Sequence, residues 1–182
     1  MNRFKPSVRD LCLIAVFAAI MAVMAQISIP MPYGVPMTMQ TFAVPLAGFI
    51  LGAKRGTVSA LIYVLLGAVG LPVFTQFTGG LGIVFGATGG FILSFPILAW
   101  TAGFGAVKRN WAWLIFWLAT GAAINYVCGM TWFCFVMSSG LKTAFTACVL
   151  PFIPTAVIKI ALVAVLGRQI KKALMKGTRY ND

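Results

Sequence analysis

Apolar stretches of about the length that crosses a bilayer follow one another along the whole chain, with only short polar breaks between them. A membrane-spanning helix needs ~20 mostly apolar residues. Charged residues make up 9% of the 182 residues and hydrophobic residues 61%, whereas a soluble domain is about 25% charged. A soluble chain of this length has no core large enough to hide so much apolar surface. The sequence therefore predicts an all-α integral membrane protein.

Six apolar stretches are expected to be the transmembrane helices of a single domain over residues 1–182. Ser7 and Asp10 are typical of a helix start, and we interpret the first stretch as a retained helix, not a signal peptide, because further spans follow at once. Three prolines within 29–36 predict an ordered loop after it. The second and third stretches are short. The approximate spans are 11–28, 39–53, 57–70, 83–107, 111–137 and 148–168.

The positions of the cations test this division, because Lys and Arg gather in short cytoplasmic segments. Six helices with a cytoplasmic N-terminus place the N-terminus, 54–55, 108–109 and the tail that begins at Arg168 on the cytoplasmic side. Those segments carry twelve of the 14 cations, and the expected outer loops 29–38, 71–82 and 138–147 carry only Lys142. We therefore expect a multi-pass protein of the cytoplasmic membrane with both termini in the cytoplasm.

Few side chains suit catalysis or metal binding. There is no His, and the two acids, Asp10 and Asp182, lie near the termini, which leaves no carboxylate pair, Ser-His-Asp triad, Cys-His dyad or His-based metal site. The four cysteines form no CxxC pair, and the chain lacks a phosphate-binding GxxxxGKS/T motif. We expect no catalytic residue, no metal, no cofactor and no nucleic acid partner. A membrane-embedded enzyme and a purely structural scaffold are the alternatives from other classes.

Lys159 is the one cation inside an expected membrane helix, nine residues before Arg168. That spacing puts it on the order of 13 Å from the cytoplasmic cation, and an ionisable group at such depth costs ~2.5–3.5 kcal/mol on insertion scales. A lysine that snorkels to the outer interface is the simpler interpretation. Because the sequence offers no intramembrane acid as a partner, we hypothesise that Lys159 binds the acid group of an anionic substrate.

Three further regions contain candidate ligand-binding residues. The proline-rich loop from Ile29 to Gln40 has a partly preset shape and is either a rigid turn or a lid over a cavity, with Thr38 or Gln40 touching ligand. Of the glycine-rich stretch 71–91, we place Thr78, Gly79 and Gly80 near a pocket and Thr88 to Gly90 in helix packing. Asn125 and Tyr126 in the fifth helix either bridge helices or face a cavity.

The first helix carries small residues four apart, which let helices approach closely. This face contacts either a partner protein or another helix of the same chain. The residues are Ala15, Ala18, Ala19 and Ala22.

Several motifs, taken in order over essentially the whole chain, resemble the BioY family of biotin transporters. They include Pro36-Met-Thr38-Met-Gln40-Thr-Phe, Leu51-Gly-Ala-Lys54-Arg55-Gly56, Gly86-Ala-Thr88-Gly89-Gly90-Phe and Pro151-Phe-Ile-Pro154 followed by Lys159. The resemblance implies six membrane helices and a substrate-binding S component of an energy-coupling factor transporter. It also implies that biotin enters under the loop between the first two helices. An alanine-rich face of the first helix would dock onto a transmembrane coupling protein, and two ATPase subunits would supply the energy.

One position departs from the family pattern. The family often has an acid, placed to hydrogen-bond the ligand, three residues before the lysine, and here Ala156 occupies that position. Alanine accepts no hydrogen bond, so Thr155 or Asn125 is the substitute for the ureido contacts, or the ligand is another small anionic vitamin. The lysine of the family pattern is present here as Lys159, so the resemblance implies the same role for it.

Overall fold

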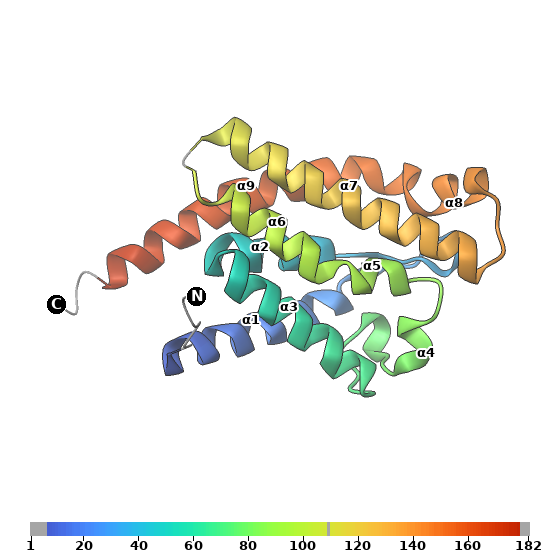
Figure 1. Ribbon diagram of the computed structural model, residues 1–182, viewed down its shortest axis with the longest axis horizontal. Coiled ribbons are helices and arrows are strands. Elements are labelled where there is room, and N and C mark those ends of the chain that lie inside the picture. The colour runs from blue at the N-terminus through green and yellow to red at the C-terminus, as the bar shows by residue number, and fades with distance from the viewer. Residues whose placement is uncertain (1–6, 109, 179–182) are drawn as a thin grey trace, which may run out of the picture.

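The computed structural model describes residues 7–108 and 110–178, which form a helical bundle (Figure 1). Arg3, Lys5, Arg109, Arg179 and Asp182, which entered the charge argument, lie outside the described residues. The helices are α1 (Val8–Gln26), α2 (Gln40–Leu51), α3 (Ala53–Ala68), α4 (Leu81–Val84), α5 (Gly89–Leu93), α6 (Phe95–Gly105), α7 (Trp111–Val136), α8 (Leu141–Cys148) and α9 (Ile153–Thr178). Short 3₁₀ turns lie at η1 (Pro32–Gly34), η2 (Thr75–Phe77) and η3 (Leu150–Phe152), and the strands β1 (Ser28–Ile29) and β2 (Met37–Thr38) pair antiparallel.

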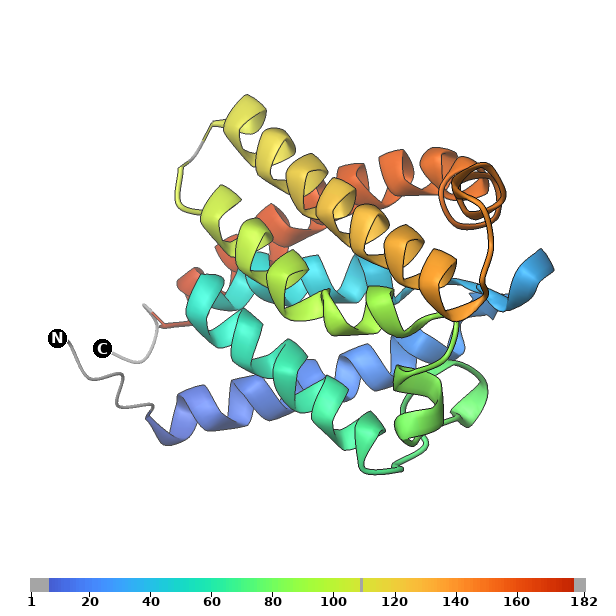
Figure 2. The ribbon, with the colours of Figure 1, turned by 45° about the vertical axis from the view of Figure 1, so that its right-hand side comes forward.

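The helices lie in three layers, with α2 and α6 in the middle, α1 and α3 on one side, and α7 and α9 on the other (Figures 1 and 2). Small residues allow the close approach of the middle layer to its neighbours. A Cβ on Gly48 of α2 would overlap the carbonyl oxygen of Ala99 in α6, and one on Gly103 would overlap the backbone of Ala53. Glycine is therefore required at these crossings for the helices to pack at this distance.

Within residues 7–108 and 110–178, three helical stretches are long and apolar enough to cross a membrane by length and composition, namely Val8–Gln26, Trp111–Val136 and Leu141–Leu174. The helices Gln40–Leu51 and Phe95–Gly105 are apolar but shorter. The chain is thus a mostly helical membrane protein, as expected. Its six-helix topology stays a prediction.

Several predicted boundaries are wrong. The expected span 83–107 is divided into α4, α5 and α6, because the chain turns at 85–88 and again at Ser94. The helix α2 contains Pro45 and ends close to the predicted boundary, at Gly52, whose φ of 82° is accessible to glycine. Lys54 and Arg55 lie in the first turn of α3 instead of in a loop. The basic stretch that follows Arg168 continues α9, and part of the expected outer loop 138–147 is α8.

The described cations separate between the two ends of the bundle. The start of α1, the α2–α3 junction, the α6–α7 connection and the last turns of α9 lie at the same end, while α4, α8 and the β1–β2 hairpin lie at the other (Figure 1). Interactions hold several cations there: Arg55 pairs with Asp10 at 3.0 Å, and Arg168 stacks 3.7 Å from the ring centroid of Trp111. Lys142, at the start of α8, lies at the opposite end.

Candidate functional site

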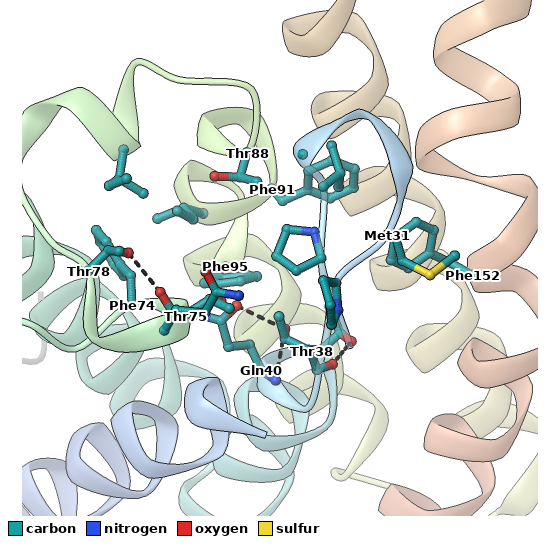
Figure 3. A pocket seen from close by; sticks show the side chains of 18 of the residues that line it. Met31, Thr38, Gln40, Phe74, Thr75, Thr78, Thr88, Phe91, Phe95 and Phe152 are labelled. Carbon is teal, nitrogen blue, oxygen red and sulfur yellow. Dashed lines mark hydrogen bonds between the residues drawn. The ribbon is translucent and has the colours of Figure 1, made fainter. Parts of the chain in front are cut away.

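A cavity of about 290 Å³ lies between the β1–β2 hairpin and the loops around α4, at the end of the bundle remote from most of the cations (Figures 1 and 3). This volume is at the lower end of the range for small-molecule sites, roughly 300–1,000 Å³. Its lining residues are Pro30, Met31, Gly34, Val35, Pro36, Thr38, Gln40, Thr41, Phe74, Thr75, Gln76, Thr78, Ile83, Thr88, Phe91, Ile92, Phe95, Tyr126 and Phe152.

The hairpin forms one wall of the cavity, and its sequence fixes its shape. Prolines limit its backbone, and Tyr33 and Gly34, with φ of 69° and 75°, turn the chain back on itself. The strands pair Ser28 with Thr38 and Ile29 with Met37. Val35 at the tip is 3% exposed and packs against the end of α7 and α8. The predicted ordered loop is therefore present, and it lines a cavity, while its role as a lid stays a prediction.

A hydrogen-bond network joins the base of the hairpin to α3. Thr38 Oγ1 donates to Gln40 Oε1 at 2.9 Å, Gln40 Nε2 donates to the Tyr63 hydroxyl, and that hydroxyl donates to the Val73 carbonyl at 3.1 Å. Gln40 and Tyr63 are buried. Because an amide nitrogen has two hydrogens and Gln40 uses one among the described residues, the other is available to a ligand. The structure brings the predicted Thr38 and Gln40 together in the cavity wall.

Lys159 lies behind this wall instead of in it. It lines a separate void of about 20 Å³, shared with Asn125, Tyr126, Ala156 and Thr41 among others. Its Nζ donates to the Thr38 carbonyl at 2.6 Å and to Thr41 Oγ1 at 2.9 Å, and the side chain is 8% exposed.

Lys159 has no acid partner among the described residues, as the sequence predicts, but it is not without partners, because neutral oxygens bind it. Sequence reasoning considered only acids, whereas the ammonium group is bound by neutral oxygens. Among the described residues the one acid is Asp10, which pairs with Arg55 at the other end of the molecule. The positive charge of Lys159 therefore has no carboxylate beside it within residues 7–108 and 110–178.

Aromatic side chains form much of the remaining surface of the cavity. Phe74, Phe91, Phe95 and Phe152 line it, together with Tyr126, whose ring meets Phe91 edge to face at a centroid distance of 6.5 Å (Figure 3). Sequence reasoning missed all four phenylalanines. The chain contains 15 Phe residues, and no periodicity separates those of a pocket from those facing lipid. The position of Phe91 next to Gly89 and Gly90 was the one local signal.

Besides Lys159, four predicted ligand-binding residues do not line the cavity. Gly79 packs on the Leu71 carbonyl, and Gly80 precedes α4 with its N–H bonded to the Gly67 carbonyl at 2.7 Å. Asn125 donates to the Phe91 carbonyl and to Ser94 Oγ, which joins α7 to α5 and α6. Thr155 donates to the Phe152 carbonyl of its own turn. These four residues support the cavity walls instead of contacting its space.

Thr78 and Tyr126 do line the cavity, as predicted. Thr88 also lines it, although it was assigned to packing. Its neighbours Gly89 and Gly90 pack as expected, because a Cβ on either would overlap Val84 or Cys128 and Trp132. Of the glycine-rich stretch, the threonines therefore face the cavity and the glycines allow close packing.

The four alanines of α1 do not share one outward face. Ala18 is 4% exposed in the core and Ala22 is half-buried, whereas Ala15 and Ala19 are exposed. The predicted roles are contact with a partner protein and contact with another helix of the same chain. Ala18 makes contacts of the second kind. Ala15 and Ala19 remain accessible.

The sequence pattern that defines the BioY family matches residues 1–176. A probable biotin transporter BioY of Pyrococcus horikoshii is 38% identical over 163 residues, which cover 90% of this chain and 96% of that protein. The biotin transporter BioY of Thermotoga maritima is 36% identical over 165 residues, with the same coverage of both chains. Among solved structures, the S-component for biotin from an ECF-type ABC transporter is similar at a TM-score of 0.84, with 28% identity and coverage of 91% and 92%.

Proposed function

The chain belongs to the BioY family, and we propose that it binds biotin with high affinity and mediates its uptake as the substrate-binding S component of an energy-coupling factor transporter. The family is one of transporters and not of enzymes. The observation that carries the proposal is the cavity beneath the hairpin, whose lining combines aromatic rings with a few fixed hydrogen-bonding groups.

Biotin has an apolar bicyclic ring with a polar ureido edge, and an aliphatic chain that ends in a carboxylate. Apolar rings and chains are favourably buried against the phenylalanine side chains. Gln40, Thr38 and Thr78 offer donors and acceptors of the kind that a ureido group needs. The Lys159 ammonium supplies a positive charge behind the cavity wall, where it is bound to Thr38 and Thr41. These features support a small, anionic, partly apolar ligand.

In the proposed mechanism ATP hydrolysis lies in partner chains, which agrees with a sequence that contains no phosphate-binding GxxxxGKS/T motif. The proposed partners are a transmembrane coupling protein and two ATPase subunits. The exposed Ala15 and Ala19 on α1 are the proposed docking face, since small residues allow close helix approach.

In the proposed arrangement, six membrane helices place both termini in the cytoplasm. The clustering of cations at one end of the bundle supports this orientation in the cytoplasmic membrane. In the proposed orientation the cavity opens toward the outer side, from which substrate would arrive.

Ala156 favours one alternative, an S component for a different small anionic vitamin. It lies in the void beside Lys159 and Asn125, so the acceptor that the family often has at this position is missing. Asn125 does not compensate directly, because it does not line the cavity beneath the hairpin and its side chain joins α7 to Phe91 and Ser94.

Isothermal titration tests the proposal against the alternative. The protein is produced in cells starved of biotin, so that the site is empty, and is titrated in lipid nanodiscs with biotin and with other anionic vitamins such as pantothenate and lipoate. The proposal predicts saturable binding of biotin at or below micromolar concentration. No binding of biotin at that level would defeat it, and tight binding of another vitamin would establish the alternative. Co-purification of coupling and ATPase subunits from native membranes tests the partners.

A further inference from the structure

Gln26, the last residue of α1, joins this helix to a loop of the cavity through both ends of its side-chain amide. Its Nε2 donates to the Phe74 carbonyl at 3.0 Å and to the Ala22 carbonyl at 3.0 Å, and its Oε1 accepts the Phe77 N–H at 2.8 Å. The side chain is half-buried and does not line the cavity. It therefore touches the loop but not the space that a ligand would occupy.

The loop 74–78 is tightly folded and strained. The Phe74 N–H donates to the Thr78 carbonyl at 2.9 Å, and the Thr78 hydroxyl donates to the Thr75 carbonyl at 2.8 Å. Between them, Gln76 and Phe77 both have left-handed backbone angles, with φ of 57° and 54°. Side-chain-bearing residues adopt these angles at a cost in free energy and hold them when surrounding contacts enforce them.

This loop contributes four residues to the cavity lining, namely Phe74, Thr75, Gln76 and Thr78 (Figure 3). Gln26 binds the loop at the carbonyl where the turn begins and at the N–H of one of its strained residues. A single side chain must donate and accept here, which an amide does. Methionine, of similar size, can do neither. The chemistry at this point therefore requires an amide of the length of glutamine.

We propose that Gln26 is a positioning residue for ligand binding, because it holds the strained loop 74–78 in the conformation that presents Phe74, Thr75 and Thr78 to the cavity. This inference rests on the proposed function for the identity of the ligand. Gln26 acts through the loop and not by contact with the ligand. Its removal weakens binding by letting the loop relax, so that part of the binding free energy is used to restore it.

The test compares Gln26→Met and Gln26→Glu with wild-type protein. Gln169→Met, the same exchange at an exposed residue near the other end of the bundle, is the matched control. Two quantities are measured: the dissociation constant for biotin of the folded protein, and the hydrogen-exchange rate of the Phe77 amide without ligand. Loss of the hydrogen bonds in Gln26→Met should raise both about tenfold. Gln26→Glu keeps an acceptor for the Phe77 N–H and loses the donors, so its values should fall between those of the wild type and Gln26→Met.

Gln169→Met should change neither quantity. The proposal is overturned if Gln26→Met and Gln26→Glu both bind biotin within twofold of the wild type, or if Gln169→Met weakens binding as much. A purely structural role would lower the unfolding temperature without changing the dissociation constant of the folded protein, and it would overturn the proposal as well. If Gln26→Met does not fold, Gln26→Glu decides alone. If the wild type binds no biotin, the proposed function fails, and the exchange rate of the Phe77 amide still decides the role of Gln26.

Discussion

Replacing Lys159 with methionine is expected to abolish the preference for a negatively charged ligand while leaving the protein folded. Methionine keeps most of the apolar stem and removes the ammonium group. The two groups that lose a partner are neutral oxygens, those of Thr38 and Thr41. No buried carboxylate among the described residues is left unpaired, because Asp10 pairs with Arg55. The exchange is therefore milder than breaking a buried ion pair, which costs about 3–5 kcal/mol.

The magnitude follows from the place of the ammonium group behind the cavity wall. In direct contact, at ~4 Å and an effective dielectric constant of ~20, a ligand carboxylate would gain about 4 kcal/mol. Lys159 instead contacts Thr38 and Thr41, which line the cavity, so a separation on the order of 7 Å is appropriate. The same relation then gives about 2.4 kcal/mol, or roughly 50-fold in affinity.

A thermodynamic cycle measures this interaction without the other contacts of the ligand. Biotin and its neutral primary amide are each titrated into wild-type protein and into Lys159→Met. For each protein, the preference is the difference in binding free energy between the two ligands. The difference between the preferences of the two proteins is the coupling free energy. The wild type should prefer biotin roughly 50-fold and the variant should show little preference. Lys142→Met, which removes an exposed cation of α8, should keep the full preference. A coupling below about threefold would refute the reasoning, since the carboxylate would then lie away from Lys159.

Three further predictions concern packing, the cavity wall and the cation-rich end. Gly48→Ala should lower the unfolding free energy by about 1–3 kcal/mol, because its methyl group would overlap a backbone carbonyl of α6; in a thermal melt Gly82→Ala, which meets open space, should behave as wild type. Tyr63→Phe removes the hydroxyl between Gln40 and the chain at Val73 and should weaken biotin binding about tenfold by titration, with unchanged affinity as the contrary result. Asp10→Asn breaks the ion pair with the partly exposed Arg55 and should cost about 1 kcal/mol or less, with a larger loss in melting temperature at low salt than at high salt; equal losses would contradict an electrostatic origin.

Local sequence signals identified the hairpin wall of the cavity well. Three prolines and the absence of charge between 29 and 36 predict an ordered loop, and Thr38 and Gln40 lie where that loop meets α2. Backbone restriction by proline is a property of the residue itself, so it can be read without the rest of the fold. The same holds for Gly89 and Gly90, whose missing side chains predict close packing wherever the partner lies.

Long-range partners could not be read from the sequence. Lys159 binds Thr38 and Thr41, which are more than a hundred residues away and belong to the hairpin and α2. A backbone carbonyl has no sequence signature, so a search for acids left the lysine without a partner. Asn125 was placed in the ligand site for a related reason, because its sequence does not tell whether its amide serves a ligand or the neighbouring helices.

Neutral groups line this cavity, and the charged Lys159 lies behind them. We therefore predict that specificity for the ring of a ligand and specificity for its negative charge can be changed separately. The groups that line the cavity are neutral, and the Gln40 and Thr38 side chains are held in place by Tyr63 and by each other. In the proposed function they would recognise the ring of the ligand through hydrogen bonds, whose strength depends on distances to within a fraction of an ångström. Lys159 lies behind Thr38 and Thr41, and it would act through its charge, whose interaction energy falls off slowly with distance. Loss of the ligand's carboxylate should therefore lower affinity without changing which ring is preferred, whereas Tyr63→Phe should alter ring preference and leave the preference for charge intact.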